Sequence, residues 1–316
     1  MDCKMGRLII VPQYPTKLRY QEWWINEFQR HFNILFGEVV TLGYRPLVEQ
    51  RAQQGSFAPG REAIKFETEQ INEFMEMKLR DDDILLLNDL SYPGLFAHVL
   101  FHKRPKKCFA ICHATSKNRF DIFADDRKIK YPIERKVAEL FDDIFVASAY
   151  HVHKLGWKNL RMFPFPYPPF EVDVPNSFIR VYPIISVARD SKQKRSVTIE
   201  KEVERSFKCK ILHPKVFSWN EYYYEALGRS KVMLITAKEE TFGYQVLDAV
   251  LAGCIPVAPN HFSYPELIPK EYLYNNLNEL FDILIKALSG RLPVPKLLTE
   301  SNSLKFYQYL TEHMTK

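Results

Sequence analysis

Hydrophobic residues follow two alternating arrangements along this chain. Short unbroken apolar runs, rich in Val, Ile and Leu, occur at 7–12, 38–43, 82–90 and 107–115, and from 142 into a helical stretch that reaches 157. Between them lie stretches whose apolar residues recur about every 3.6 positions, at 21–36, 61–79, 95–103 and 133–141. The first arrangement predicts strands covered on both faces, and the second predicts helices. Strands that alternate with helices indicate a parallel α/β sheet.

The alternation resumes after a proline-rich segment. Five prolines fall within the twelve residues 164–175, and proline withholds a backbone donor and fixes φ, so we predict an interdomain linker there. Beyond it we predict strands at 181–189, 209–215, 231–237 and 254–259, a helix over 219–230, another after Thr241, and helices to the C-terminus. The expected domains are 1–168 and 176–300, with a helix over 301–316 that packs back on the first domain.

Composition and charge narrow the choice of ligands. Of the 316 residues 46% are apolar and 14% aromatic, which supplies ample core, and the formal net charge of +6 suits an anionic ligand without requiring nucleic acid. The charge is uneven, because residues 103–136 hold eleven Lys/Arg and four Asp/Glu, with Phe109, Phe120, Phe123 and Tyr131 interleaved. This pattern is typical of a nucleic-acid-binding surface, and a solvated face is the alternative.

Other features favour a soluble cytoplasmic protein. The five cysteines are odd in number and widely spaced, which predicts neither a disulfide framework nor a zinc site and favours a reducing compartment. The apolar run near the N-terminus is too short for a signal peptide or a membrane span. We interpret the acidic run 81–83 as a solvated turn rather than a metal motif, and His151 and His153 as surface residues.

The segment 237–259, AKEETFGYQVLDAVLAGCIPVAP, gathers polar groups at the end of a predicted strand. Asp248 follows Glu240 by eight residues, so both share roughly one face if a helix begins there. Gly243 would allow a ligand close to backbone amides, and a helix N-terminus attracts phosphate. On spacing alone the alternative is a helix start with favourable acids and a glycine needed for packing. Arg189 ends the strand predicted at 181–189 and Lys194 follows after four residues, at the strand end where ligands of parallel sheets bind.

The residues from Glu240 to Val257, ETFGYQVLDAVLAGCIPV, resemble the donor-binding signature of the retaining GT-B glycosyltransferases. Arg189 and Lys194 resemble the diphosphate-binding Arg/Lys pair of that superfamily. The resemblance implies an α/β GT-B fold, in which two Rossmann-like domains with parallel sheets face each other across a cleft. It also implies sugar transfer from a nucleoside-diphosphate sugar, most often a UDP-sugar, with retention and without a metal or other cofactor.

The same resemblance implies roles for single residues. Arg189 and Lys194 would neutralise the leaving diphosphate, while Glu240, with the backbone of Thr241, Phe242 and Gly243, would bind the donor. Asp248 would hold the ribose hydroxyls, at a position where the family usually has Glu. In the first domain, His113 resembles the active-site histidine that contacts the donor sugar, with a satisfied loop histidine as the alternative. The implied catalytic set is thus His113, Arg189, Lys194 and Glu240.

The acceptor is expected on the first domain, with contacts from Tyr14, Arg19, Ser116, Lys117 and Arg119. Trp23 and Trp24 are expected in the core instead. The loop 13–20 takes the place of the family's first loop but lacks its glycine pair. The acceptor hydroxyl could belong to a modified, for example hydroxymethylated, base of DNA or another nucleic acid, or to a glycan or small molecule. A nucleic-acid-binding or nucleotide-sugar-binding module without catalysis is the alternative class.

Overall fold

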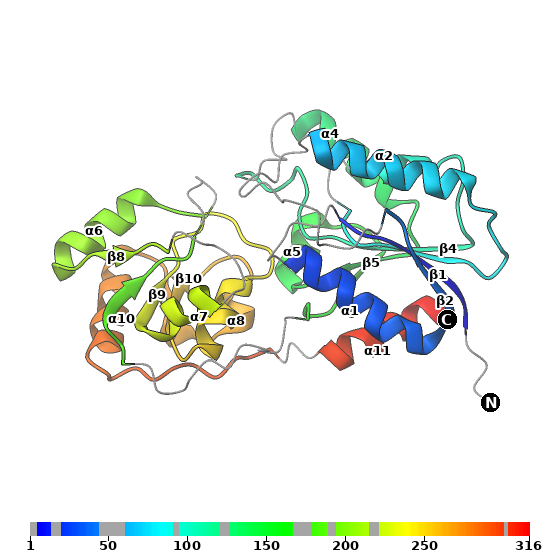
Figure 1. The fold of residues 1–316 in the computed structure, drawn as a ribbon. Helices are drawn as coiled ribbons and strands as arrows, with labels where there is room; N and C mark the ends of the chain where they lie inside the picture. The colour runs from blue at the N-terminus through cyan, green and yellow to red at the C-terminus, as the bar shows by residue number, and fades with distance from the viewer. Residues whose placement is uncertain are drawn as a thin grey trace. The chain divides into compact units, whose positions relative to one another are not determined.

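The computed structural model describes residues 5–13, 20–43, 61–90, 95–120, 127–166, 179–188, 194–214, 221–299 and 303–316. The chain divides into two compact units (Figure 1). Unit 1 consists of Met1–Ala147, Val152–Phe165 and Asn302–Lys316, and unit 2 of Ser148–His151 and Pro166–Ser301. Each unit contains a parallel sheet with helices, which confirms the predicted α/β fold class.

The described part of unit 1 holds a six-stranded parallel sheet in the order β2-β1-β3-β4-β5-β6. Its strands are β1 Met5–Val11, β2 Phe36–Thr41, β3 Ile84–Leu87, β4 Lys107–Ile111, β5 Asp143–Val146 and β6 Leu160–Met162. The helices of the same region are α1 Tyr20–Leu35, α2 Arg61–Glu76, α3 Leu95–Val99, α4 Arg127–Ala138 and the C-terminal α11 Ser303–Thr315. Helix α5, Ala149–Leu155, begins in unit 2 and ends in unit 1. All four residues of β3 are buried, as its unbroken apolar run predicted.

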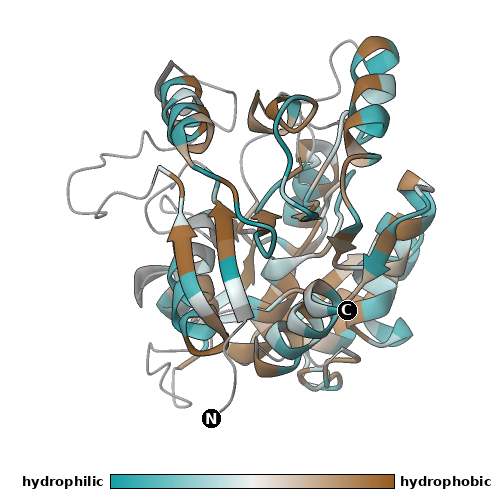
Figure 2. Ribbon diagram, turned by 90° about the vertical axis from the view of Figure 1, so that its right-hand side faces the viewer, coloured by the Kyte–Doolittle hydropathy of each residue, from teal (hydrophilic) through white to brown (hydrophobic). Residues whose placement is uncertain are grey.

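Helices cover both faces of this sheet. Helices α2 and α4 lie on one face, and α1 and α11 on the other (Figure 1). On the α1 side Trp24 is fully buried, as predicted, and its ring meets Phe28 at 5.2 Å and Phe306 of α11 at 5.5 Å between centroids. Along the helices hydrophobic and hydrophilic residues alternate (Figure 2), as expected of helices with one face on a core.

Asp83 corrects one expectation for unit 1. Asp81 and Asp82 are exposed, but Asp83 is only 1% exposed and pairs with Arg7 on β1 at 2.6 Å. Arg7 also donates to the Lys78 carbonyl. Burial by itself would raise the pKa of Asp83, but hydrogen bonds from Arg7 and from the backbone of Arg80 lower it. The acidic run is therefore only partly a solvated turn, because Asp83 is buried in an ion pair with Arg7, which is 76 residues away in sequence.

The described part of unit 2 holds a five-stranded parallel sheet in the order β11-β10-β9-β7-β8. Its strands are β7 Tyr182–Ile185, β8 Ile211–Leu212, β9 Ser230–Leu234, β10 Ile255–Pro259 and β11 Leu273–Tyr274. Its helices are α6 Val197–Phe207, α7 Glu221–Gly228, α8 Tyr244–Leu251, α9 Tyr264–Leu267 and α10 Leu277–Leu288, with a 3-10 turn over Lys270–Tyr272. Helix α6 was not predicted from the sequence, and it supplies the crossover that the parallel strands β7 and β8 require.

Chain order reverses once in each sheet, between β1 and β3 in unit 1 and between β7 and β9 in unit 2. Ligands of open parallel sheets bind at the carboxyl ends of the strands that flank such a reversal. A ligand site is therefore expected among the residues that follow β1, β3 and β4 in unit 1, or β7 and β9 in unit 2.

Candidate functional site

Lys194 and Glu240 form an ion pair beyond the carboxyl end of β9 in unit 2. The Nζ of Lys194 lies 2.8 Å from Glu240 Oε2, with the two side chains 20% and 12% exposed. Lys194 reaches this position from the segment between β7 and α6, and Glu240 from the segment between β9 and α8. A cation and a carboxylate that are 46 positions apart in sequence thus meet at the reversal point of the sheet.

The environment of Glu240 keeps its carboxylate charged. Burial would raise the pKa, but the charge and hydrogen bond of Lys194, with backbone hydrogen bonds from Thr241 and Phe242, lower it below its ordinary value. The Thr241 amide donates to Glu240 Oε1 at 3.0 Å. A charged, partly exposed carboxylate can accept hydrogen bonds from hydroxyl groups, and the adjacent ammonium can neutralise a phosphate.

Gly243 ends the loop after Glu240 and precedes α8 with φ of +102°. A side chain there would be strained by this φ, and its Cβ would lie 3.0 Å from Leu267 Cδ1. Because α8 begins at Tyr244, Glu240 stands before the helix, and the expectation that it shares a helical face with Asp248 is wrong.

Two carbonyls of this loop are held by serine hydroxyls within unit 2. Ser148 donates to the Thr241 carbonyl at 2.6 Å, and Ser263 donates to the Phe242 carbonyl at 2.8 Å. The Phe242 side chain is buried at 4% exposure. These contacts fix the backbone between Glu240 and α8, so a ligand would meet a preformed loop.

Asp248 lies on α8 and is 4% exposed. Its carboxylate accepts hydrogen bonds from Tyr223 Oη at 2.9 Å and Tyr224 Oη at 3.1 Å, both on α7. Burial, together with the nearby carboxylate, raises the pKa of both tyrosines. Tyr223 and Tyr224 were not predicted as partners, because the sequence analysis inferred only a helix over 219–230.

A second set of contacts anchors the segment that carries Lys194. Arg195 donates to Glu200 on α6 and lies 3.0 Å from His213 Nε2, and Ser186 after β7 donates to the other Glu200 oxygen at 3.1 Å. The Ser196 amide donates to Thr236 Oγ1 beyond β9 at 2.8 Å. These residues were not predicted, although Arg195 adjoins Lys194 in the sequence. These hydrogen bonds hold Arg195 and Ser196 in position, and so they position the adjacent Lys194.

His113 lies at the carboxyl end of β4 in unit 1. Its ring packs edge-on against Trp24 at 5.3 Å and Phe165 at 5.0 Å between centroids. The residue is partly exposed, but its Nε2 is shielded from solvent. Burial lowers the pKa of His113 to about 3, against a hydrogen bond with the Asn88 backbone that raises it. The imidazole is therefore neutral at physiological pH.

Asp89 joins His113 to the reversal point of the unit 1 sheet. The His113 amide donates to Asp89 Oδ1 at 3.3 Å, and the Gln13 side chain, which follows β1, donates to Asp89 Oδ2. Polar groups that follow β1, β3 and β4 are thus connected. Asp89 was not predicted as a site residue, although its place directly after a buried strand was a usable signal.

The predicted acceptor residues have different environments. Ser116 is fully buried, and its amide and hydroxyl both donate to Glu134, at 2.8 and 2.6 Å. Lys117 Nζ lies over the Tyr131 ring at 5.0 Å, and Arg119 is exposed over Phe120 at 5.3 Å. Three predicted site residues lie outside the described residues, namely Tyr14, Arg19 and Arg189.

His151 corrects another expectation, since it is 1% exposed, whereas His153 is exposed as predicted. His151 belongs to the first turns of α5, whose N-terminal amides at Ala149 and Tyr150 both donate to Glu266 at 2.8 Å. This anchoring within unit 2 accounts for its burial.

The described residues contain neither a candidate metal cluster nor a candidate membrane-spanning helix. No group of three or more His, Cys, Asp or Glu side chains in the described ranges is arranged to hold a metal ion. Over the same part of the chain, no helix combines the length and apolar character needed to cross a membrane.

Comparison with known proteins identifies the fold. Trehalose-6-phosphate synthase superimposes with a TM-score of 0.65 at 11% identity, over 98% of this chain and 99% of that chain. A sucrose-phosphate synthase from Thermosynechococcus elongatus gives 0.60 at 11% identity over 90% of both chains. The E. coli trehalose-6-phosphate enzyme bound with UDP-2-fluoro glucose gives 0.59 at 10% identity, over 98% and 99%.

The chain has the GT-B fold. The structure thus confirms the fold that the 240–257 motif implied. At 10–11% identity these GT-B structures establish the fold and not the reaction.

Sequence comparison finds a curated relative that matches part of this chain. No protein-family model matches the chain. The curated tRNA-queuosine alpha-mannosyltransferase of Drosophila melanogaster is 45% identical over 60 residues, which are 19% of this chain and 16% of that protein. The match therefore covers only a small part of the length of that relative.

Proposed function

We propose that this GT-B chain is a glycosyltransferase that moves a sugar from a nucleoside-diphosphate donor to a hydroxyl group of an RNA nucleoside. The observation that carries the proposal is the Lys194–Glu240 pair at the reversal point of the unit 2 sheet. A donor presents a diphosphate next to a polyhydroxylated ring, and this pair places a cation next to a charged acceptor of hydroxyl hydrogen bonds.

The reaction breaks the bond between the anomeric carbon and the diphosphate oxygen and forms one to the acceptor oxygen. Negative charge grows on the leaving diphosphate, which Lys194 and Arg189 neutralise without a metal ion. The acceptor proton passes to the departing diphosphate oxygen, on the same face of the sugar, so the anomeric configuration is retained. Glu240 holds sugar hydroxyls and orients the ring.

The ribose contact proposed for Asp248 needs an exchange of partners. Both carboxylate oxygens accept tyrosine hydroxyls, so a ribose hydroxyl must replace one of them or reach Asp248 through a tyrosine. A UDP-sugar remains the first donor to test, because one of the similar GT-B structures holds UDP-2-fluoro glucose.

Two observations support RNA as the source of the acceptor. The partial relative is described as acting on tRNA-queuosine. The stretch 103–136 holds eleven Lys/Arg against four Asp/Glu, an excess of seven that is larger than the net charge of +6 of the whole chain. A nucleoside in RNA is therefore favoured over a DNA base, a glycan or a small molecule.

The test is a screen of UDP- and GDP-hexoses for nucleotide release, with tRNA, DNA, glycans or no acceptor. Lys194→Ala is expected to lower turnover by about 100-fold or more, and Glu240→Gln to raise KM for the donor and lower kcat. Lys201→Ala removes an exposed lysine of α6 and is the matched control. Wild-type turnover in both site variants would contradict the proposal. Donor binding without release for any acceptor would instead indicate a binding module.

A further inference from the structure

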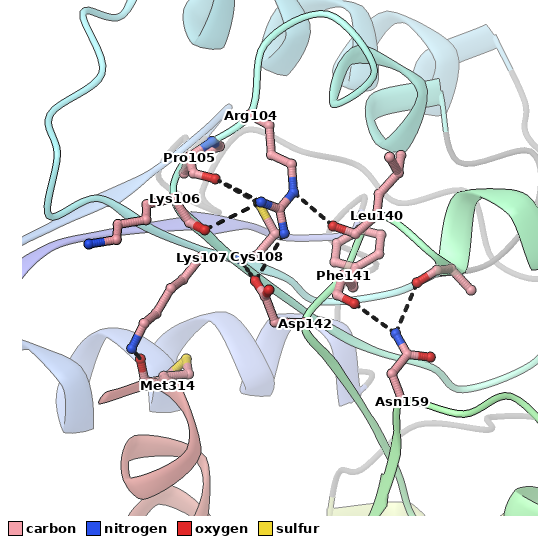
Figure 3. Close-up of polar contacts among 11 residues, drawn as sticks. Arg104, Pro105, Lys106, Lys107, Cys108, Leu140, Phe141, Asp142, Asn159 and Met314 are labelled. Atoms are coloured by element: carbon pink, nitrogen blue, oxygen red, sulfur yellow. Dashed lines mark hydrogen bonds and ion pairs between the residues drawn. The ribbon is translucent and has the colours of Figure 1, made fainter. Parts of the chain in front are cut away.

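The basic stretch 103–136 separates into two groups with different roles. The first group stabilises the fold: Arg104 donates to the carbonyls of Leu140, Pro105 and Lys106 and pairs with Asp142 at 3.0 Å (Figure 3). Lys107 Nζ donates to the Met314 carbonyl of α11 at 3.3 Å (Figure 3). Lys103 donates to three carbonyls at the end of α2 and just beyond it, those of Phe74, Met75 and Met77. These cations precede or begin β4, at the amino edge of the sheet.

The second group lies beyond the opposite end of β4. Lys117 and Arg119 follow the strand, and Arg127, Lys128 and Lys130 occupy the first turns of α4. Because α4 runs back along the sheet after β4, its first turns lie toward the carboxyl edge, where His113 is also placed. Arg119, Arg127 and Lys128 are exposed, and Lys117 and Lys130 partly so.

For Arg119, Arg127 and Lys128, the described residues supply little compensating negative charge. Glu134 is the one acid within α4, and it is buried at 4% exposure, where it holds the amide and hydroxyl of Ser116. Within the described ranges, no carboxylate lies at ion-pair distance from Arg119, Arg127 or Lys128. The stretch 121–126, which contains three further aspartates, lies outside the described residues. By contrast α6 pairs its own charges, as Arg205 does with Glu202.

Aromatic rings accompany these cations. Phe120 is 40% exposed with the Arg119 guanidinium 5.3 Å from its centroid. Lys117 lies over Tyr131, which stacks on Trp157 at 6.4 Å. Cations follow a phosphate backbone, while an exposed ring next to an arginine offers a surface on which an unpaired base can stack.

We propose that Lys117, Arg119, Phe120, Arg127, Lys128 and Lys130 form an RNA-docking patch that holds the acceptor strand at the carboxyl edge of the unit 1 sheet. This inference rests on the proposed function, since it specifies how the RNA that carries the acceptor hydroxyl is held. The cations contact the phosphate backbone of the RNA, and the ring of Phe120 stacks on a base next to the acceptor nucleoside. The cations before β4 do not take part.

The experiment measures binding of a tRNA transcript to the full chain by fluorescence anisotropy, without donor, between about 50 and 200 mM salt. Arg127→Glu/Lys128→Glu is expected to weaken binding at least tenfold and to reduce the slope of log affinity against log salt by about 2. Glutamates at the start of α4 suit the helix dipole, so the fold should persist, which the thermal midpoint checks.

Two further variants separate the patch from general charge effects. Lys106→Glu/Lys136→Glu changes the net charge by the same amount on exposed lysines outside the patch and should leave the salt slope nearly unchanged. The Lys136–Glu139 pair that it removes is exposed and contributes little to stability. Phe120→Ala should weaken binding several-fold while keeping the wild-type slope, because stacking releases no counterions.

Each other outcome overturns the patch in a recognisable way. Equal loss in the patch and control double variants would mean that only net charge matters. If the patch variant binds tRNA as tightly as wild type, the RNA-docking patch is contradicted, but the proposed sugar transfer is not. If wild type turns over a donor with another acceptor and does not bind tRNA, the RNA acceptor fails together with the patch. Binding to anionic phosphatidylserine vesicles but not to tRNA would assign these residues to a membrane surface.

Discussion

At the residue scale, burial determines what His113 and Asp248 can do. His113 is neutral because its ring lies between Trp24 and Phe165, where a positive charge would lose its hydration. Asp248 stays hydrogen-bonded because two tyrosines supply the donors that water would otherwise supply. The neutral imidazole of His113 can therefore donate or accept a hydrogen bond. The carboxylate of Asp248 holds α7 against α8.

His113 should make the protein sensitive to acid. Its pKa is about 3 in the folded chain, against 6.5 for a histidine that is exposed to water in an unfolded chain. Between these values the unfolded state binds the extra proton, so stability falls as the pH decreases from 6.5. From pH 6.5 to 5, wild type should lose up to about 2 kcal/mol more than His113→Gln. Denaturant titrations at each pH measure this, and parallel curves for the two proteins would contradict it.

At the element scale, Arg180 connects the ends of two helices in unit 2. Its guanidinium donates to two helix-end carbonyls, those of Leu227 in the last turn of α7 and Ala252 just after α8, and also to the carbonyl of Ser230 at the start of β9. At Leu227 and Ala252 this cation satisfies carbonyls that have no partner within their helix, and it opposes the negative ends of the helix dipoles. Gly253 leaves room for it, since a Cβ there would lie 2.5 Å from Arg180 Nη2.

This arrangement predicts a thermodynamic coupling. Gly253→Ala should destabilise the fold more than Gly290→Ala, because both glycines have positive φ but nothing lies within 4 Å of a Cβ at Gly290. Arg180→Met should cost about 1–3 kcal/mol, and adding it to Gly253→Ala should cost less than the sum. Urea unfolding of the four variants measures the coupling. If the losses of unfolding free energy in Gly253→Ala and Arg180→Met are additive in the double variant, Gly253 is not required for the Arg180 contacts.

Element prediction succeeded where hydrophobic pattern dominates and failed for α6. Five of its eleven residues are charged, which hid the apolar positions Ile199, Val203 and Phe207. Topology was the better signal, because the parallel strands β7 and β8 cannot be joined without a crossover.

At the scale of the whole molecule, α11 joins the far end of the chain to unit 1. Phe306, Tyr307, Leu310 and Met314 are at most 1% exposed, and Phe306 and Tyr307 contact aromatic rings of α1. The last helix in the sequence thus completes the hydrophobic core of the first sheet. Its loss would expose the α1 face of unit 1 rather than unit 2.

Phe306→Ala should therefore destabilise unit 1 by about 3–5 kcal/mol. Leu304→Ala on the same helix, at a position 58% exposed, should stay within about 0.5 kcal/mol of wild type. Thermal unfolding followed by tryptophan fluorescence in a Trp219→Phe background measures both, because the remaining tryptophans, Trp23, Trp24 and Trp157, all belong to unit 1. Equal midpoints for the two variants would show that α11 does not complete the core.

The sequence by itself determined the α/β class, most strands and the 240–257 motif with Lys194, because these depend on local apolar runs and short spacing. Only the tertiary structure decided which charges face solvent. Asp83 is buried in an ion pair with Arg7, and Asp248 accepts hydrogen bonds from Tyr223 and Tyr224. Lys103, Arg104 and Lys107 donate hydrogen bonds to backbone carbonyls. Each of these depends on a partner at least 24 positions away, which a local pattern does not contain. A charge costs free energy to bury unless that partner is present, so the fold alone assigns its role.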